Sequence, residues 1–248
     1  MAKIDIVTTA LRRPELLQIT YDSFFSQVSN LPAARIILNI DNIGEGSIDE
    51  SIAIANRYSS DVVLRIGSQP NFSNAINWCW SQLSSPLFVH LEDDWFFRHK
   101  ISFESWVSHL RSSKASQSVL VMKRRRPVNS LRYSFRPNLA WSREVAKIGW
   151  IPANVNPEKF VSGQSEILTS SDYGQDCRRY IEDTGRIWSK AQGLQKADEG
   201  GKWFVNRKST LVTQWRYKLS VLRWSLLSIM QKEENYLGNL RRALKYFK

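Results

Sequence analysis

This sequence of 248 residues lacks the long apolar runs of membrane-spanning proteins and has few of the cysteines typical of disulfide-rich and zinc-binding proteins. No apolar run reaches the roughly 18 residues that cross a bilayer, so we expect no transmembrane span. The two cysteines, Cys79 and Cys177, lack metal-type spacing and are expected to remain unpaired thiols. The first residues enter a strand-like segment without a signal-peptide pattern. We therefore expect a cytoplasmic protein, in the host cytoplasm if a phage encodes it.

Acidic residues are scarce beside basic ones, with 23 Asp and Glu against 35 Lys and Arg and a net charge of +12. Such a charge favours polyanionic partners: nucleic acid, anionic lipid surfaces or phosphorylated glycans. One basic region is either a solvated surface or a site that binds phosphate groups near the acceptor substrate. Its residues are Lys123, Arg124, Arg125, Arg126, Arg132 and Arg136.

The second basic region is residues 210–248, which have helical periodicity and mix basic residues with Trp, Tyr and Leu. Three interpretations are open. The apolar residues can pack onto the domain and leave a basic outer face, which we favour. The helix can lie on an anionic membrane surface as a peripheral contact. It can also present Lys and Arg to a nucleic-acid backbone.

Strand-like and helix-like segments alternate through the first half of the domain, in units of about 25–30 residues. This alternation predicts an α/β fold with a mostly parallel sheet covered by helices on both faces. We expect one domain, 1–209, with a donor half 1–100 and an acceptor half 101–209, followed by the basic segment. Strands are predicted at 4–9, 35–40, 61–66, 87–91 and 118–123, and helices at 14–27, 48–58, 73–83 and 102–110.

Three carboxylates, Glu92, Asp93 and Asp94, directly follow a predicted buried strand. In a low dielectric they would repel each other, and a divalent cation would relieve that repulsion. A period of two places Glu92 and Asp94 on one side and Asp93 on the other. Carboxylates suit Mg²⁺ or Mn²⁺, which also bind phosphate oxygens. A solvated acidic turn is the alternative.

Four motifs in order carry a resemblance to a known family. They are Thr8-Thr9-Ala10 with Arg13-Pro14, then Asp41, then Asn71–Asn77, then Glu92-Asp93-Asp94-Trp95. Together they resemble the GT-A nucleotide-sugar transferases, family 2-like branch. The resemblance implies a GT-A (Rossmann-like) fold and an inverting, metal-dependent glycosyltransferase that uses Mn²⁺ or Mg²⁺. The implied donor is a nucleotide-sugar, a UDP-sugar first.

The resemblance also assigns roles to residues. It implies that Asp94, with Glu92, holds the metal, and that Glu92 or Asp93 reaches the ribose or a metal-bound water. Asn71 and Asn77 would line the donor pocket, although helix capping explains Asn71 equally well. The residues implied to contact base and ribose are Thr8, Ala10, Arg13 and Asp41.

An inverting enzyme needs a carboxylate base, for which Glu158 is the first candidate, before Asp172, Asp176 and Asp183. An ordinary carboxylate at the start of a helix after Pro157 explains Glu158 equally well. Relatives often supply a late histidine as a third metal ligand before a Gly-Arg-x-Trp-like segment. Here Gly185–Trp188 has no such histidine before it. Either Asp183 substitutes, or the carboxylates and donor phosphates hold the metal alone. His90 is expected to be a core residue with satisfied hydrogen bonds.

The acceptor is expected to be a hydroxyl on a polyanion. DNA with hydroxymethylated pyrimidines, as in phage-type DNA modification, is slightly favoured over a cell-envelope glycan (lipopolysaccharide or capsule) at the inner membrane face. A non-catalytic nucleic-acid-binding protein is a further alternative, although no zinc-finger, homeodomain or RNP-like motif is present. A nucleotidyltransferase is disfavoured, because residues 8–13 contain no glycine for a phosphate loop.

Overall fold

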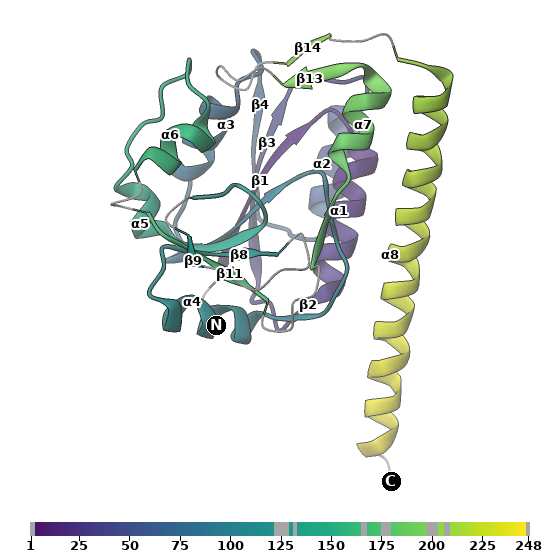
Figure 1. Ribbon diagram of the computed structural model, residues 1–248. Coiled ribbons are helices and arrows are strands. Elements are labelled where there is room, and N and C mark those ends of the chain that lie inside the picture. The colour runs from purple at the N-terminus through teal and green to yellow at the C-terminus, as the bar shows by residue number, and fades with distance from the viewer. Residues whose placement is uncertain are drawn as a thin grey trace.

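The computed structural model describes residues 3–121, 129–130, 133–164, 168–174, 180–196, 203–205 and 209–246. In this part of the chain one large sheet lies between two layers of helices (Figure 1). Its strands are β1 (Ile4–Leu11), β3 (Ala34–Asp41), β4 (Val62–Gly67), β5 (Leu87–Glu92), β8 (Gln117–Leu120), β9 (Asn129–Ser130), β10 (Asn138–Trp141) and β11 (Ser170–Tyr173). Their order is β4-β3-β1-β5-β10-β8-β11-β9.

Short strand pairs and the helices complete the described fold. The pairs are β12 (Ile181–Asp183) with β6 (Trp95–Phe97), β13 (Leu194–Lys196) with β14 (Trp203–Val205), and β2 (Val28–Ser29) with β7 (Ile101–Ser102). The helices are α1 (Pro14–Gln27), α2 (Ile48–Asn56), α3 (Phe72–Ser81), α4 (Phe103–Ser113), α5 (Ser142–Ala146), α6 (Pro157–Gly163), α7 (Gly185–Gln192) and α8 (Leu211–Tyr246).

The four strands that the donor half contributes to the large sheet are parallel, as the sequence predicted. Their register brings the carboxyl ends together: Leu11 lies opposite Asp41, Asp41 opposite Gly67, and Thr9 opposite Glu92. Beyond β5 the pairing changes, because β10 runs antiparallel to both β5 and β8. The carboxyl edge of β1, β3 and β5 is therefore where a ligand site is expected.

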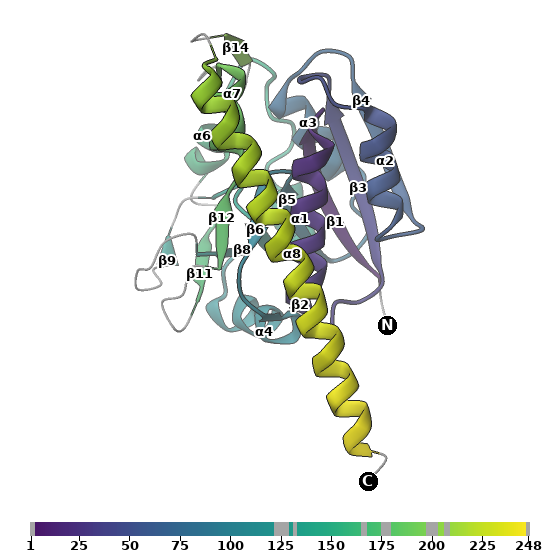
Figure 2. The same ribbon diagram turned by 90° about the vertical axis from the view of Figure 1, so that its right-hand side faces the viewer.

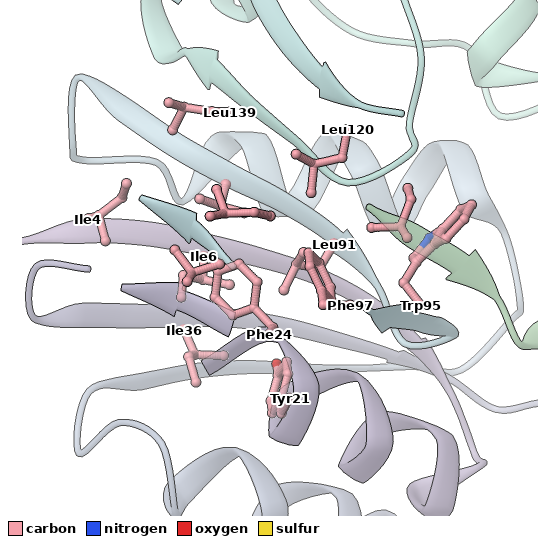
Figure 3. Packing of buried hydrophobic residues seen from close by; sticks show 14 of the residues in the cluster. Ile4, Ile6, Tyr21, Phe24, Ile36, Leu91, Trp95, Phe97, Leu120 and Leu139 are labelled. Atoms are coloured by element: carbon pink, nitrogen blue, oxygen red, sulfur yellow. The ribbon is translucent and has the colours of Figure 1, made fainter. Parts of the chain in front are cut away.

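The core has two layers, one on each face of the sheet. On one face α1 packs Tyr21 and Phe24 against the strands, and Trp95 and Phe97 lie in the same cluster (Figure 3). The opposite face is covered by α3, α5 and α6, whose cluster includes the free thiol of Cys79. Cys177 lies outside the described residues. Burial on both faces explains why the strands are almost uniformly apolar.

The long helix α8 lies along α1 and α7 in both views (Figures 1 and 2). Its inward face carries Trp224, which is 1% exposed, together with the partly buried Tyr217 and Leu227. Its outward face carries large apolar side chains, among them Trp215 and Leu222. The favoured expectation is therefore confirmed for the packing, but the outer face is not purely basic, because exposed apolar side chains lie on it beside the basic ones. No described helix has a stretch long and apolar enough to span a bilayer.

His90 on β5 is a core residue as predicted, but its hydrogen bonds are not satisfied within the described residues. Its side chain is fully buried, and neither ring nitrogen has a partner there. The ring makes an edge contact with Phe135 at 5.3 Å. Burial lowers the pKa of His90 from 6.5 to about 3. The imidazole is therefore neutral in the folded protein at physiological pH.

Replacing His90 by leucine is expected to remove an acid-sensitive component of stability. Below pH 6.5 His90 is protonated in the unfolded chain, whereas in the folded chain it stays neutral down to about pH 3. The wild type then loses about 1.4 kcal/mol per pH unit relative to His90→Leu. Thermal melts of both proteins from pH 7.5 to pH 5 should diverge by about 4–8 °C. A constant difference across that range would contradict the assignment.

Candidate active site

The acidic turn after β5 is held in place by β1 and α1. The backbone N–H of Asp93 donates to the carbonyl of Thr9 at 3.1 Å. The next strand, β6, docks on α1 through two hydroxyls: Thr20 accepts from the N–H of Trp95 at 3.0 Å, and Ser23 accepts from that of Phe97 at 3.1 Å. Asp94 is therefore fixed on both sides along the chain.

Arg13 joins two of the three carboxylates. Its Nε and Nη2 donate to the two oxygens of Asp93 at 2.9 and 2.6 Å, and Nη2 also donates to Oδ2 of Asp94 at 2.8 Å. Asp93 additionally accepts from the N–H of Leu11 at 2.9 Å. The expected separation of Asp93 from Asp94 by strand alternation is wrong, because β5 ends at Glu92 and the two aspartates lie in a turn.

The Arg13 side chain is 4% exposed, and its guanidinium lies 4.8 Å from the ring centre of Trp188 on α7. Burial acts to lower the pKa of Arg13, but the charges of Asp93 and Asp94 raise it above its ordinary value, so the group stays protonated. Arg13 thus neutralises much of the repulsion from which the sequence argument inferred a cation. In this structure its contacts with Asp93, Asp94 and Trp188 make it a support of the acidic turn.

A fourth carboxylate reaches the turn from far along the chain. β12 pairs with β6 so that Asp183 lies opposite Trp95, and the N–H of Thr184 donates to the carbonyl of Asp94 at 2.8 Å. Burial and the nearby Asp94 charge both raise the pKa of Asp183. Asp183 also accepts from the backbone N–H of Arg186 at 3.1 Å, at the start of α7. Two carboxylates therefore meet at the amino end of a helix.

Gly185 packs tightly against Asp94. A Cβ atom added there would lie 2.0 Å from Oδ2 and 2.7 Å from Cγ of Asp94. Only glycine leaves space for the carboxylate in this position. Asp94 itself is 19% exposed, so its oxygens remain accessible to a ligand.

These residues fit a divalent cation that shares its coordination with phosphate. Among the described side chains, no three His, Cys, Asp or Glu residues gather to hold a metal. Mg²⁺, however, is commonly bound by one or two carboxylates, water and substrate phosphates. Asp94 and Asp183 supply such a pair. Burial first, and the nearby Asp94 charge second, raise the pKa of Asp183, which also pairs with Arg186 at 2.8 Å. Glu92 at the end of β5 is half-buried and accepts from Trp95 Nε1 at 3.4 Å.

Asp41 lies at the carboxyl end of β3, on the same carboxyl edge of the sheet as the acidic turn. Its oxygens accept from Asn39 Nδ2 at 3.0 Å and from the N–H of Asn71 at 3.1 Å. Gly67 passes so close that a Cβ would lie 2.6 Å from Oδ1 of Asp41. The Asp41 carboxylate is therefore oriented at the end of β3, where a nucleoside is expected from the resemblance.

Thr8 and Ala10 occupy a different environment from the one expected. Thr8 is fully buried, and its hydroxyl accepts from Tyr21 at 2.9 Å beneath α1. Ala10 is 3% exposed within the same core. Alternation along β1 turns these two side chains towards the helix layer. Both side chains are therefore buried in the core in this structure.

Asn71 and Asn77 connect α3 to the acceptor half. Asn71 caps α3 by accepting from the N–H of Asn74 at 2.9 Å, and it donates to the carbonyl of Ala153 at 2.8 Å. Asn77 donates to the carbonyl of Ile151 at 2.8 Å and accepts from its N–H at 2.9 Å. The capping interpretation of Asn71 thus holds, and both amides act as anchors for the segment 151–155.

The base candidates and the basic region are only partly described. Glu158 is exposed in the first turn of α6, which lies beside α3 (Figure 1). Arg136 is half-buried, and its Nε donates to the hydroxyl of Ser134 at 3.1 Å. The following predicted residues lie outside the described part of the chain: Asp176, Lys123, Arg124, Arg125, Arg126 and Arg132.

The structure adds two residues to the site that sequence reasoning did not assign. Trp188 covers the Arg13 guanidinium, and Gly185 makes room for Asp94. Both belong to the Gly-Arg-x-Trp segment noted in the sequence. That segment was the sequence feature from which their roles could have been predicted. Their roles depend on the β12–β6 pairing, which joins segments about 85 residues apart.

Comparison with known proteins shows the fold. No family model matches the sequence, and no curated protein matches it. Crystal structures of S. aureus TarS 1–349 match at 9% identity over 76% of this chain, with a TM-score of 0.52, and in complex with UDP over 77%, with a TM-score of 0.54. The chain spans only 64% of that TarS fragment.

A second protein matches along almost the whole chain. The mannosyltransferase PcManGT from Pyrobaculum calidifontis, in complex with GDP-Man and Mn²⁺, matches at 10% identity over 99% of this chain and 80% of that one, with a TM-score of 0.53. At such identities the likeness establishes the fold alone. It is the GT-A fold expected from the sequence.

Proposed function

We propose that this protein is a metal-dependent glycosyltransferase that moves a sugar from a nucleotide-sugar to a hydroxyl acceptor. The observation that carries this proposal is the Asp94–Asp183 carboxylate pair at the carboxyl edge of a GT-A sheet, next to the amino end of α7. Neighbours with the same fold support it, because TarS was solved with UDP and with UDP-GlcNAc, and PcManGT with GDP-Man and Mn²⁺.

In this proposal the residues in and around the acidic turn have different roles. Asp94 and Asp183 hold Mg²⁺ or Mn²⁺, which when bound neutralises charge on the leaving diphosphate. Asp93 and Arg13 fix the position of Asp94, since their ion pair is almost completely buried. Asp41 holds the nucleoside at the end of β3. A UDP-sugar is the first donor to test, followed by GDP-sugars.

The acceptor half supplies the base. Glu158 is proposed to take the proton of the acceptor hydroxyl at its carboxylate while the sugar is transferred with inversion. It stands in the first turn of α6, which packs beside α3 (Figure 1). Asn71 and Asn77 fix the preceding segment 151–155, so α6 has a defined place relative to β3.

The acceptor has two candidate classes. Hydroxymethylated DNA is a polyanion that a protein with a net charge of +12 attracts. A cell-envelope glycan at a membrane is attracted in the same way when the glycan or the lipid is anionic. Both classes present hydroxyl groups and negative charge. They differ in whether the acceptor is attached to a lipid surface.

We expect a nucleoside diphosphate or a nucleotide-sugar to raise the melting temperature of the whole chain in the presence of Mn²⁺ or Mg²⁺. A ligand at about 100 times its Kd stabilises the fold by about 2.7 kcal/mol, or roughly 5–11 °C. The assay compares uridine, guanosine, adenosine and cytidine diphosphates and their sugars, with metal or with chelator.

Two variants make this test specific. Asp94→Asn should lose the metal-dependent part of the shift, whereas Asp61→Asn, an exposed carboxylate paired with Lys3, should keep it. The absence of a shift with every nucleotide would overturn the proposed function. It would leave a polyanion-binding protein as the better interpretation.

A further inference from the structure

The outward face of α8 is a continuous apolar stripe, which we call the α8 stripe. Its residues are separated by steps of three or four, as one face of a helix requires. Each of these side chains is more than half exposed. The α8 stripe consists of Leu211 (77%), Trp215 (64%), Leu219 (58%), Leu222 (57%), Leu226 (53%) and Ile229 (53%), with Val212 (60%) and Met230 (57%) at its margin.

The opposite face of α8 is fixed to the domain, so the helix cannot turn to bury the stripe. Trp224 and Ser228 are each 1% exposed. Tyr217 donates to Glu15 on α1 at 2.5 Å, Gln231 donates to the carbonyl of Phe97 at 3.2 Å, and Lys232 pairs with Asp22. The stripe therefore stays exposed along the packed part of α8, a helix that lies on the outside of the domain (Figure 2).

Positive charges lie on both sides of the stripe. At 100° per residue, Arg216 and Arg223 lie along one margin and Lys218 along the other. All three are exposed, and within the described side chains none of them forms an ion pair. The helix contains no acidic residue before Glu233. An apolar surface with basic margins is the pattern that binds anionic interfaces.

A second copy of this chain fits the stripe less well. If two stripes packed as a coiled coil, Lys218 and Arg223 would lie at the flanking positions that decide pairing. Because both are positive, parallel and antiparallel arrangements would each bring like charges together. Nucleic acid also fits poorly, because phosphates would leave the row of leucines and Trp215 in water.

We propose that the α8 stripe is a docking surface for an anionic lipid membrane. The helix lies in the interfacial plane with Trp215 and the leucines among the acyl chains, while Arg216, Lys218 and Arg223 contact lipid phosphates. The observations that carry this proposal are the exposed stripe, its fixed inner face and its basic margins.

This surface is tied to the candidate active site. Trp224 of α8 lies in the same apolar cluster as Trp188, whose ring contacts Arg13. Docking through α8 would therefore hold the acidic turn near the membrane. The docking surface favours a lipid-borne glycan over DNA as the acceptor. This choice of acceptor rests on the proposed function, whereas the docking proposal does not.

Vesicle flotation of the whole chain tests the docking surface. We expect the protein to float with vesicles of phosphatidylcholine mixed with phosphatidylglycerol, and to bind vesicles of pure phosphatidylcholine at least tenfold more weakly. The triple variant Leu219→Gln, Leu222→Gln, Leu226→Gln should lose at least tenfold in binding to the anionic vesicles. The variant Arg216→Gln, Lys218→Gln, Arg223→Gln should lose the preference for anionic lipid.

A matched control carries the same chemical change elsewhere. Ile66 and Trp150 are also exposed apolar residues, at 49% and 68%, and Ile66→Gln with Trp150→Gln should bind vesicles like the wild type. Sedimentation without lipid gives the second readout. A dimer that the leucine triple variant abolishes would overturn the proposal and assign the stripe to a second copy. Absence of flotation would overturn it too, and neither result depends on nucleotide binding.

Discussion

Replacing Arg13 by methionine is expected to destabilise the protein by about 3–5 kcal/mol, the usual cost of leaving a buried charge without its partner. Asp93 is 1% exposed and receives two of its hydrogen bonds from Arg13, at 2.9 and 2.6 Å. Methionine fills similar space beside Trp188 but provides no donor. Thermal melts should show a loss of about 6–20 °C.

The pH dependence identifies the cause of this loss. Burial already raises the pKa of Asp93 against the opposing effect of Arg13, and removing Arg13 leaves only the N–H of Leu11 to oppose burial and the Asp94 charge. A carboxyl whose folded pKa is raised stabilises least at high pH, because the folded state must then give up its proton. Arg13→Met should therefore be closer to wild type at pH 5 than at pH 8.

Two controls separate the ion pair from side-chain packing. Adding Asp93→Asn to Arg13→Met removes both charges and should restore at least half of the lost stability. Arg12→Met changes the adjacent arginine, which bonds Asn42 and the carbonyl of Gly46 in a more exposed setting, and should cost about 1 kcal/mol. If Arg12→Met and Arg13→Met cost the same, the buried ion pair does not organise the turn.

The role of Arg13 illustrates what the sequence alone can predict. The parallel donor half was predictable, because β-branched strands alternate with helices and punctuation such as Pro14 and Asn71 sets the helix starts. The acidic turn was found for the same reason, since it ends a buried strand. Its partner was not found, because Arg13 is 80 residues away and the resemblance assigned it to base and ribose instead.

Two further differences have physical causes. Strand alternation predicted the directions of Asp93 and Asp94, but it holds only while the strand continues, and β5 stops at Glu92. The period of α8 was predictable, but Trp224 and Trp215 are equally apolar, so the choice of inner face depends on the surface of α1 and α7. Asp183 was named from the resemblance as a possible ligand, and its position beside Asp94 arises from a short strand pair with little signal of its own.

Replacing Asp94 by asparagine is expected to lower kcat/KM by about 10²–10³-fold, the usual effect of removing one group that stabilises transition-state charge. Asparagine retains an oxygen that can accept from Arg13, and Asp93 keeps its own bonds, so stability should change by less than about 1 kcal/mol. Release of nucleoside diphosphate from the donor found by thermal shift gives the rate. Calorimetric titration of Mn²⁺ in the presence of that diphosphate gives the metal affinity.

Gly185→Ala tests the same carboxylate without altering its chemistry. The added Cβ, at 2.0 Å from Oδ2, must displace Asp94 from its 2.8 Å contact with Arg13. Activity and Mn²⁺ affinity should fall at least tenfold, the range seen when the positioning of a ligand is lost. Gly163→Ala, where an added Cβ has no neighbour within 4 Å, should leave both unchanged. If Asp94→Asn and Gly185→Ala both retain Mn²⁺ affinity, the cation is held elsewhere, and the pair of Asp94 and Asp183 loses its assigned role.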